Sequence, residues 1–216
     1  MLNIKRFIFN FIEVNCYLLW DETKEAVVVD CGAFGENERE ELSRFIAENK
    51  LTLRHQIYTH GHFDHIFGAQ HIADTYGILP TLYSKEAETY LAAAEQMQAF
   101  LHRSLPLSIP PVGCSLNDEE IIEFGTHKLK VIATPGHTPG GVCYYCAEEG
   151  VLLSGDSLFQ CCIGRCDLPG GDESTLVNGL CKRILPLPDA VRVLPGHGPE
   201  TTIAYERNNN PYLFTP

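Results

Sequence analysis

The sequence predicts an α/β protein of the α+β type, in which two mixed β-sheets pack together and helices cover both outer faces as a four-layer αββα sandwich. In each half of the chain strand-like segments lead and helix-like segments follow, which disfavours strict βαβ alternation. The composition, 44% hydrophobic and 20% charged, provides enough apolar material for a sizeable core. Because no linker or tandem repeat interrupts the 216 residues, we expect one domain over 1–216.

The N-terminal half is expected to begin with strands and to alternate with helices afterwards. Apolar and β-branched runs predict strands at 4–9, 14–20, 25–30, 53–58 and 80–83. Apolar residues at helical spacing predict helices at 36–49, 65–76 and 84–102. Gly77 would end the second helix, and Ser84 would cap the third. Residues 105–111, which contain three prolines, are expected to form a loop.

The C-terminal half repeats this order of strands followed by a helix. Its apolar runs predict strands at 119–124, 127–133, 142–147, 151–154 and 190–194. One amphipathic segment predicts a helix at 173–185. The residues beyond the last strand are expected to be irregular.

The chain is acidic, with a net charge of −12 from 16 basic and 28 acidic residues. Such a field repels nucleic-acid backbones and anionic membrane surfaces. No apolar run approaches the roughly 20 residues that span a bilayer. We therefore expect a small-molecule substrate and neither a nucleic-acid nor a membrane partner, while the sequence leaves the oligomeric state open.

The cysteines and the N-terminal residues favour a cytoplasmic protein. Nine cysteines are an odd number without framework spacing, which indicates reduced thiols. The apolar run at 7–12 follows Lys5 and Arg6 as in a signal peptide. However, Asn10 and Glu13 interrupt it and no small-residue cleavage site follows.

Residues 60–65 concentrate three imidazoles and a carboxylate, on His60, His62, Asp64 and His65. Burying four such groups together is costly unless a cation or a complete hydrogen-bond network satisfies them. Neutral imidazole and carboxylate suit zinc or another first-row ion. The cluster therefore predicts a metal site, and the alternative is a solvated polar loop rich in histidine.

Three further segments consist of an apolar strand, a glycine and a candidate ligand. They end at His137, Asp156 and His197. Glycine lets the chain turn sharply at a strand end, so that the next side chain can project into a shared site. One such segment alone would be an ordinary turn. Four strand ends that all carry ligand-type residues predict a multi-ligand metal site at a sheet edge.

The order His60-x-His62-x-Asp64-His65, then a distant histidine, aspartate and histidine, resembles the signature of the metallo-β-lactamase superfamily. The resemblance extends from about Val14 to His197. It implies a metallo-β-lactamase-like fold and two divalent metal ions, with zinc favoured and iron or manganese as alternatives. One ion would be held by His60, His62 and His137, the other by Asp64, His65 and His197, with Asp156 bridging them. Such a pair suits metal-assisted hydrolysis.

The segments around these ligands are similar to glyoxalase II, which hydrolyses thioesters of glutathione. The similar segments are Thr59, 134–140, 155–159 and 195–198. The resemblance implies a hydroxyacylglutathione hydrolase-like enzyme acting on a thioester such as S-lactoylglutathione. Arg165 stands near the position of a glutathione-contacting lysine of that family, and Asp167 replaces a tyrosine. With only 19 residues after His197, the resemblance is closest to the short, single-domain members.

The same resemblance implies the catalytic roles. A metal-bridging hydroxide would be the nucleophile, because a bound divalent ion lowers the pKa of water towards about 7. Asp64 would act as a ligand that also accepts the hydrogen bond of the hydroxide, and Asp156 as the bridging ligand. Arg165 could form a bidentate fork with a substrate carboxylate. Its alternative is a surface salt bridge with Asp167 or Asp172.

Three alternatives to thioester hydrolysis remain open. The segment 164–167 also resembles the persulfide dioxygenases, a sister branch of oxidoreductases that work with one iron. Another ester, a lactone or a β-lactam could be the substrate, because the fold and metal centre constrain the reaction type more than the substrate. A non-catalytic metal-binding module is the third alternative.

The remaining notable cysteines are expected to be structural. Cys161, Cys162 and Cys166 are expected to be buried and inert, and the alternative is a redox switch or extra metal ligands. Cys143 and Cys146 have zinc-knuckle spacing, but on a strand residues three apart point to opposite faces.

Other tyrosines and histidines are also assigned to packing. Tyr144, Tyr145 and Tyr205 could line a pocket, although core or rim packing is more typical of strand tyrosines. We assign surface or hydrogen-bonded structural positions to His55, His71, His102 and His127.

Overall fold

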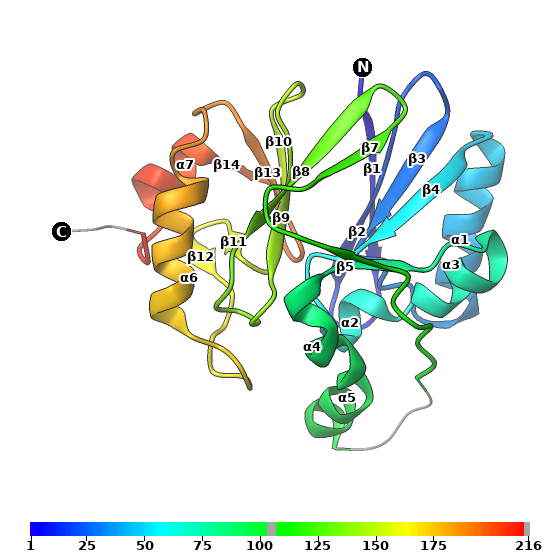
Figure 1. Ribbon diagram of the computed structural model, residues 1–216, viewed down its shortest axis with the longest axis horizontal. Helices are drawn as coiled ribbons and strands as arrows, with labels where there is room; N and C mark the ends of the chain where they lie inside the picture. Colours follow the sequence, from blue (N-terminus) through cyan, green and yellow to red (C-terminus); the bar gives the residue numbers. More distant parts are fainter. Residues whose placement is uncertain (103–106, 214–216) are drawn as a thin grey trace.

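The computed structural model describes residues 1–102 and 107–213, and in these ranges two six-stranded sheets pack against each other (Figure 1). The first sheet has the order β1 (Asn3–Phe9), β2 (Val14–Trp20), β3 (Glu25–Val29), β4 (Thr52–Ile57), β5 (Pro80–Tyr83) and β6 (Cys114–Leu116). The second has the order β14 (Thr201–Thr202), β13 (Arg192–Pro195), β10 (Val151–Gly155), β9 (Val142–Cys146), β8 (His127–Ala133) and β7 (Ile121–Phe124). Both sheets contain parallel and antiparallel pairs.

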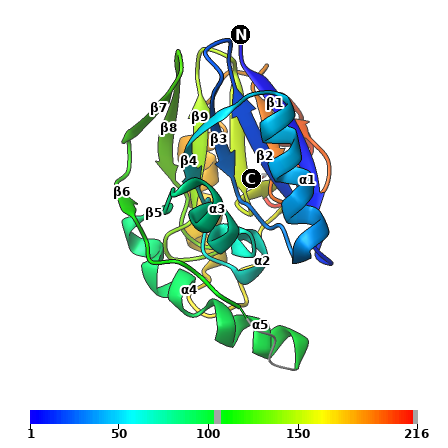
Figure 2. The same ribbon diagram turned by 90° about the vertical axis from the view of Figure 1, so that its right-hand side faces the viewer.

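Helices cover both outer faces of this pair of sheets (Figures 1 and 2). The first sheet is covered by α1 (Gly35–Glu48) and α3 (Ala69–Tyr76). The second is covered by α6 (Glu173–Gly179), the π-helix η2 (Leu180–Ile184) and α7 (Ile203–Asn209). The short segments α2 (Phe63–Ile66), η1 (Ser84–Glu86), α4 (Ala87–Leu91) and α5 (Ala93–Leu101) lie at one end of the sandwich. Among the described residues, no helix has the length and apolar character needed to cross a membrane.

Three apolar cores separate these four layers. Successive strand residues point to opposite faces, so Leu18 packs towards the helices and Leu19 into the space between the sheets. In the second sheet Leu153 faces the space between the sheets, whereas Leu152 packs against α6 and η2. The predicted four-layer αββα arrangement of two mixed sheets is therefore confirmed.

Five strands end at the same edge of the sandwich. In the first sheet β3 and β4 are parallel. In the second, β10 is parallel to β13, and β8 shares their direction because β9 is antiparallel to both β8 and β10. The sheets are joined at this edge by the backbone, where Val142 N–H donates to Thr59 O at 2.9 Å. Side chains that follow these five strands consequently meet in one place.

Two predicted helices differ in their bounds. The helix expected at 65–76 starts earlier and is broken into α2 and α3, because Gly68 leaves no room for a side chain against Cys31 and donates its N–H to Cys31 O at 2.8 Å. The helix expected at 84–102 is divided into η1, α4 and α5 with a break at Ala92. Ser84 lies inside η1 and does not cap it, so that prediction was wrong.

Several short elements were not predicted. These are β6, the hairpin of β11 (Leu158–Phe159) and β12 (Cys162–Ile163), β14 and α7. The tail expected to be irregular contains α7, which is capped by Thr202 through its side chain and the N–H of Tyr205. Helix α6 continues as the π-helix η2 over most of the remaining predicted length. The predicted loop at 105–111 begins outside the described residues, and its part from 107 contains no helix or strand.

Candidate metal centre

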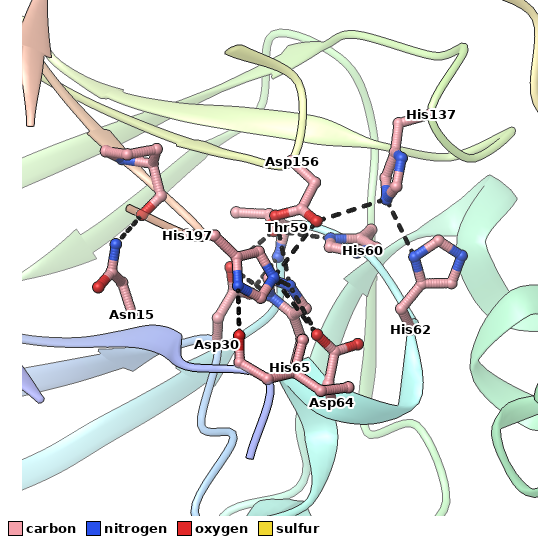
Figure 3. Close-up of polar contacts among 12 residues, drawn as sticks. Asn15, Asp30, Thr59, His60, His62, Asp64, His65, His137, Asp156 and His197 are labelled. Carbon is pink, nitrogen blue, oxygen red and sulfur yellow. Dashed lines mark hydrogen bonds and ion pairs between the residues drawn. The ribbon is translucent and has the colours of Figure 1, made fainter. Parts of the chain in front are cut away.

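The seven predicted ligands converge at the edge where the five strands end (Figure 3). The cluster at 60–65 follows β4, His137 follows β8, Asp156 follows β10 and His197 follows β13. Asp64 and His65 lie within α2, whose first turn directs both towards the second sheet. Ligands separated by more than a hundred residues are thus brought together by strand direction alone.

The ligand atoms form three overlapping groups that could hold a metal ion. The groups are His60, His62 and His137; His60, His65 and Asp156; and Asp64, His65 and His197. Asp156 lies between the outer two groups, with Oδ1 3.3 Å from His65 Nε2 and Oδ2 3.7 Å from His137 Nε2. Its carboxylate therefore faces both sets of imidazoles.

These separations fit a metal site. Atoms about 2.0–2.1 Å from a tetrahedral zinc ion lie about 3.3 Å from one another. His62 Nδ1 and His137 Nε2 are 3.0 Å apart, and His65 Nε2 and His197 Nε2 are 3.3 Å apart. Within 1–102 and 107–213, the buried Nε2 of His60 and Oδ1 of Asp156 have no hydrogen-bond partner. Unsatisfied buried polar atoms are costly, and a cation in their midst would satisfy them.

Hydrogen bonds orient the imidazoles. His137 Nδ1 donates to Arg165 O at 2.7 Å, and His197 Nδ1 donates to Ile12 O at 3.1 Å. His60 Nδ1 lies 3.1 Å from Thr59 Oγ1. The carbonyl acceptors of His137 and His197 place a proton on Nδ1, so Nε2 is the atom of these two rings that faces the site. This is the usual arrangement of metal-binding histidines.

Asp30 contacts the ligand cluster but was not among the predicted site residues. It follows β3, and its Oδ2 lies 3.2 Å from His65 Nδ1 and accepts a hydrogen bond from Thr59 Oγ1 at 2.7 Å. Asp30 therefore supports His65 directly and His60 through Thr59. A signal was available, because Asp30 and Gly32 end an apolar strand like the other ligand segments.

Glycines make room for the ligand side chains at the ends of two strands. Gly155 adopts a positive φ of 48°, a conformation that L side chains rarely adopt, and so turns the chain into Asp156. A side chain at Gly196 would collide with Asp156 Oδ1 and come within 2.7 Å of His65 Cε1. Both glycines keep the space between the ligands open.

The first group contains imidazoles that resist protonation. Burial, reinforced by His65 and His62, holds the pKa of His60 well below its usual range. Burial and the neighbouring His137 lower the pKa of His62 to about 4. These rings are neutral at pH 7 and can offer lone pairs without losing a proton.

In the second group, nearby carboxylates raise the pKa values of the histidines more than burial lowers them. Burial opposes the charged form of His65, but Asp156, Asp64 and Asp30 raise its pKa well above its usual range. The pKa of His197 is raised in the same way by Asp156 and Asp64 against the effect of burial. Burial disfavours ionised Asp156, yet His65 and His197 hold its pKa well below its usual range. Metal-free protein therefore carries protons in this group that a cation must displace.

The residues proposed for substrate contact pair with each other. Arg165 Nε and a terminal nitrogen donate to the two carboxylate oxygens of Asp167, both at 2.7 Å, and both side chains are exposed. This is the surface salt bridge foreseen as the alternative to a substrate fork. Asp172 instead caps α6, accepting from Thr175 N at 2.8 Å. The main-chain carbonyl of Arg165 contacts the site through His137.

The expectation that Cys161, Cys162 and Cys166 are buried was wrong, because all three are partly exposed around the β11–β12 hairpin. This hairpin is too short to bury both its faces. Cys143 and Cys146 point to opposite faces of β9, into different cores, as predicted.

The other assignments to packing are mostly confirmed. Tyr144 is buried between the sheets and donates to Tyr58 O at 2.8 Å. His127 is buried and contacts Asp21 at 3.2 Å and Glu149 at 2.8 Å. It begins β8, whereas His137 follows the opposite end of that strand. His55 and His71 hydrogen-bond to Glu123 O and Ser43 respectively.

Comparisons with known proteins agree with this geometry. The family model of the metallo-beta-lactamase superfamily matches residues 10–197, a range that contains all seven ligands. The hydroxyacylglutathione hydrolase GloC of Haemophilus influenzae is 34% identical, covering 98% of each chain.

Two solved structures share the fold over nearly the whole chain. The BLEG-1 B3 metallo-beta-lactamase is 38% identical with a TM-score of 0.90, covering 99% of this chain and all of that one. TTHA1623, solved in a di-iron-bound form, is 32% identical with a TM-score of 0.84, covering 97% of this chain and all of that one. With its ligand set at one edge of an αββα sandwich, the chain belongs to the metallo-β-lactamase superfamily.

Proposed function

We propose that this protein is a metal-dependent thioester hydrolase that acts on a small acyl thioester such as S-lactoylglutathione. The observation that carries the proposal is the convergence of seven His and Asp side chains in two groups of three that share Asp156 as a neighbour. The thioester is favoured by the similarity to a hydroxyacylglutathione hydrolase over 98% of both chains.

Two divalent ions fit the two groups. His60, His62 and His137 would hold one ion, Asp64, His65 and His197 the other, and Asp156 would contact both. Zinc suits the imidazole-rich set. The di-iron form of TTHA1623 makes iron the second candidate. Such ions supply a water that ionises near neutral pH and polarise a carbonyl oxygen.

The residues of the chain position this chemistry. The Oδ2 atom of Asp64 lies 3.3 Å from His197 Nε2. This carboxylate would accept a hydrogen bond from the attacking water and so orient it. The Nδ1 hydrogen bonds of His137 and His197 hold both rings while the acyl group is bound. Arg165 would leave Asp167 to bind a substrate carboxylate, since an exposed pair of this kind contributes little to stability.

The test is a substrate panel with metal-loaded protein. We expect the highest kcat/KM with S-lactoylglutathione. A lactone and a chromogenic β-lactam should be turned over more slowly or not at all, and glutathione persulfide should cause little or no oxygen uptake. His60→Ala should abolish turnover, whereas His55→Ala, a histidine outside the cluster, should not. Thioester hydrolysis no faster than that of His60→Ala would overturn the proposal.

A second substrate class has its own support. BLEG-1, described as a B3 metallo-beta-lactamase, is 38% identical over almost the whole chain. A β-lactam has the same kind of polarised carbonyl as a thioester. If the chromogenic β-lactam gives the highest kcat/KM of the panel, β-lactam hydrolysis replaces the thioester assignment.

A further inference from the structure

A buried carboxylate lies beside the metal centre without belonging to it. Glu86, the last residue of η1, is fully buried, and Oε1 accepts from Gly61 N–H at 2.9 Å. Oε2 accepts from the hydroxyl of Thr138 at 3.0 Å. One donor lies between His60 and His62, and the other directly follows His137. Glu86 thus joins the two loops that supply the first ligand group.

The packing around Glu86 is equally close. A side chain at Gly61 would come within 2.5 Å of the backbone nitrogen of Tyr90, and one at Gly140 within 2.5 Å of both the nitrogen and Oε2 of Glu86. The Gly140 N–H and the Thr89 side chain also lower the pKa of this carboxylate, against the effect of burial. Segment η1–α4 is therefore held between two ligand loops that come from different sheets.

Burial of this carboxylate has to be offset by its hydrogen bonds. An unpaired buried charge costs several kcal/mol, whereas one that accepts several N–H and O–H donors is tolerated. Burial raises the pKa of Glu86 while the donors from Gly61, Thr138 and Gly140 oppose that shift. A merely structural carboxylate could be placed anywhere, but this one has its donors within one to three residues of three metal-site histidines.

We infer that Glu86 is a positioning residue that fixes the loops of His60, His62 and His137 relative to each other and so sets the metal affinity of the first ligand group. The inference rests on the metal centre proposed above. Glutamine at position 86 has no charge and a single acceptor oxygen, so either the Gly61 N–H or the Thr138 hydroxyl would face its amide nitrogen in place of a carboxylate oxygen. Glu86 accepts no hydrogen bond from a ligand of the second group. That group is joined to the first loop through His65, whose N–H donates to His62 O at 3.1 Å, so it should be weakened less.

The chain offers a matched control. Glu206 is also fully buried, and it accepts from Cys161 N at 2.9 Å, from Thr201 Oγ1 at 2.6 Å and from Asn210 Nδ2 at 2.8 Å. It has the same chemistry as Glu86 but joins no segment that carries a ligand of the first group. Glu206→Gln should lower the melting temperature without changing metal affinity.

The experiment measures metal binding, with activity left aside. Chelator-stripped protein is titrated with Co²⁺ and followed by its visible absorption, in a His197→Ala background that isolates the first group and a His62→Ala background that isolates the second. We expect Glu86→Gln to weaken binding about 10–100-fold in the first background and less than about threefold in the second. Thr138→Val, which removes one hydrogen bond, should have a smaller effect of the same kind.

The outcomes separate the two proposals. Equal weakening in both backgrounds, no weakening in either, or an equal effect of Glu206→Gln would overturn the role of Glu86. If Glu86→Gln does not fold, Thr138→Val decides, and unchanged affinity of the first group in that variant overturns the inference. If neither His62→Ala nor His197→Ala alters the Co²⁺ titration of the parent protein, the metal centre itself is wrong.

Discussion

The two ligand groups differ in charge although they share an edge of the sandwich. The first consists of three imidazoles, and the second contains Asp64 with His65 and His197. Asp30 adds another carboxylate behind His65. Imidazoles suit zinc, iron and copper, whereas carboxylates also accept harder ions such as manganese. The first group is therefore suited to a borderline ion such as zinc, whereas the affinity of the second group should depend on both the type of ion and the pH.

Removing one ligand from each group should have the largest effect. Roughly 10–16 kcal/mol of zinc binding is shared among about four ligands, so losing one costs about 3 kcal/mol, or about a hundredfold or more in affinity. We expect His62→Ala and His197→Ala each to abolish a different binding event in a Zn²⁺ titration. If both variants lose the same event, the two groups are not separate sites.

The response to pH should separate the groups next. The pKa of His65 is raised, so below that pKa a cation must displace its proton, and affinity should fall about tenfold per proton and pH unit. The pKa of His62 is about 4 and that of His60 is well below its usual range, so these two ligands should release no proton on metal binding between pH 8 and 6. Calorimetry in buffers of different ionisation enthalpy would count the protons. Equal proton release from His62→Ala and His197→Ala protein would contradict this difference.

Asp30→Asn should weaken the second group selectively. The variant keeps the shape of Asp30 but removes the charge beside His65, so the metal affinity of the second group should fall about 10–100-fold. The affinity of the first group should fall less, because Asp30 reaches it only through Thr59. Asp21→Asn is the control, because Asp21 is an equally buried carboxylate that accepts from Thr126 at another turn. An equal loss of affinity in the two variants would show a general effect on stability.

The smallest expected effect comes from the β1–β2 turn. Asn10 donates to Gly32 O and to Asp64 O, both at 2.9 Å, and has a positive φ of 57°. Asn10→Ala should lower the free energy of unfolding by about 1–3 kcal/mol in urea denaturation and weaken only the second group, by less than about tenfold. Asn10→Gly also removes the hydrogen bonds, but glycine adopts a positive φ without strain. If Asn10→Gly is as stable as the parent protein, the loss in Asn10→Ala comes from backbone strain and not from the hydrogen bonds.

The fold and the ligands could be predicted because their signals are local. Each ligand follows an apolar strand and a short turn. The shared direction of these strands then brings the ligands to one edge of the sandwich. Gly68 breaks a helix through its contact with Cys31, and Glu86 is buried by loops from both sheets. Neither contact leaves a pattern in the neighbouring sequence. The break at Gly68 and the contacts of Glu86 could therefore not be predicted, since both depend on a partner distant in the chain.

The hydrogen bonds of His137 and His197 have an evolutionary consequence. Their acceptors are the main-chain carbonyls of Arg165 and Ile12, which every amino acid possesses. The side chains at these two positions can therefore change without releasing the rings. At Arg165, whose side chain is exposed, the loop can therefore change its contact with substrates while the backbone still holds His137.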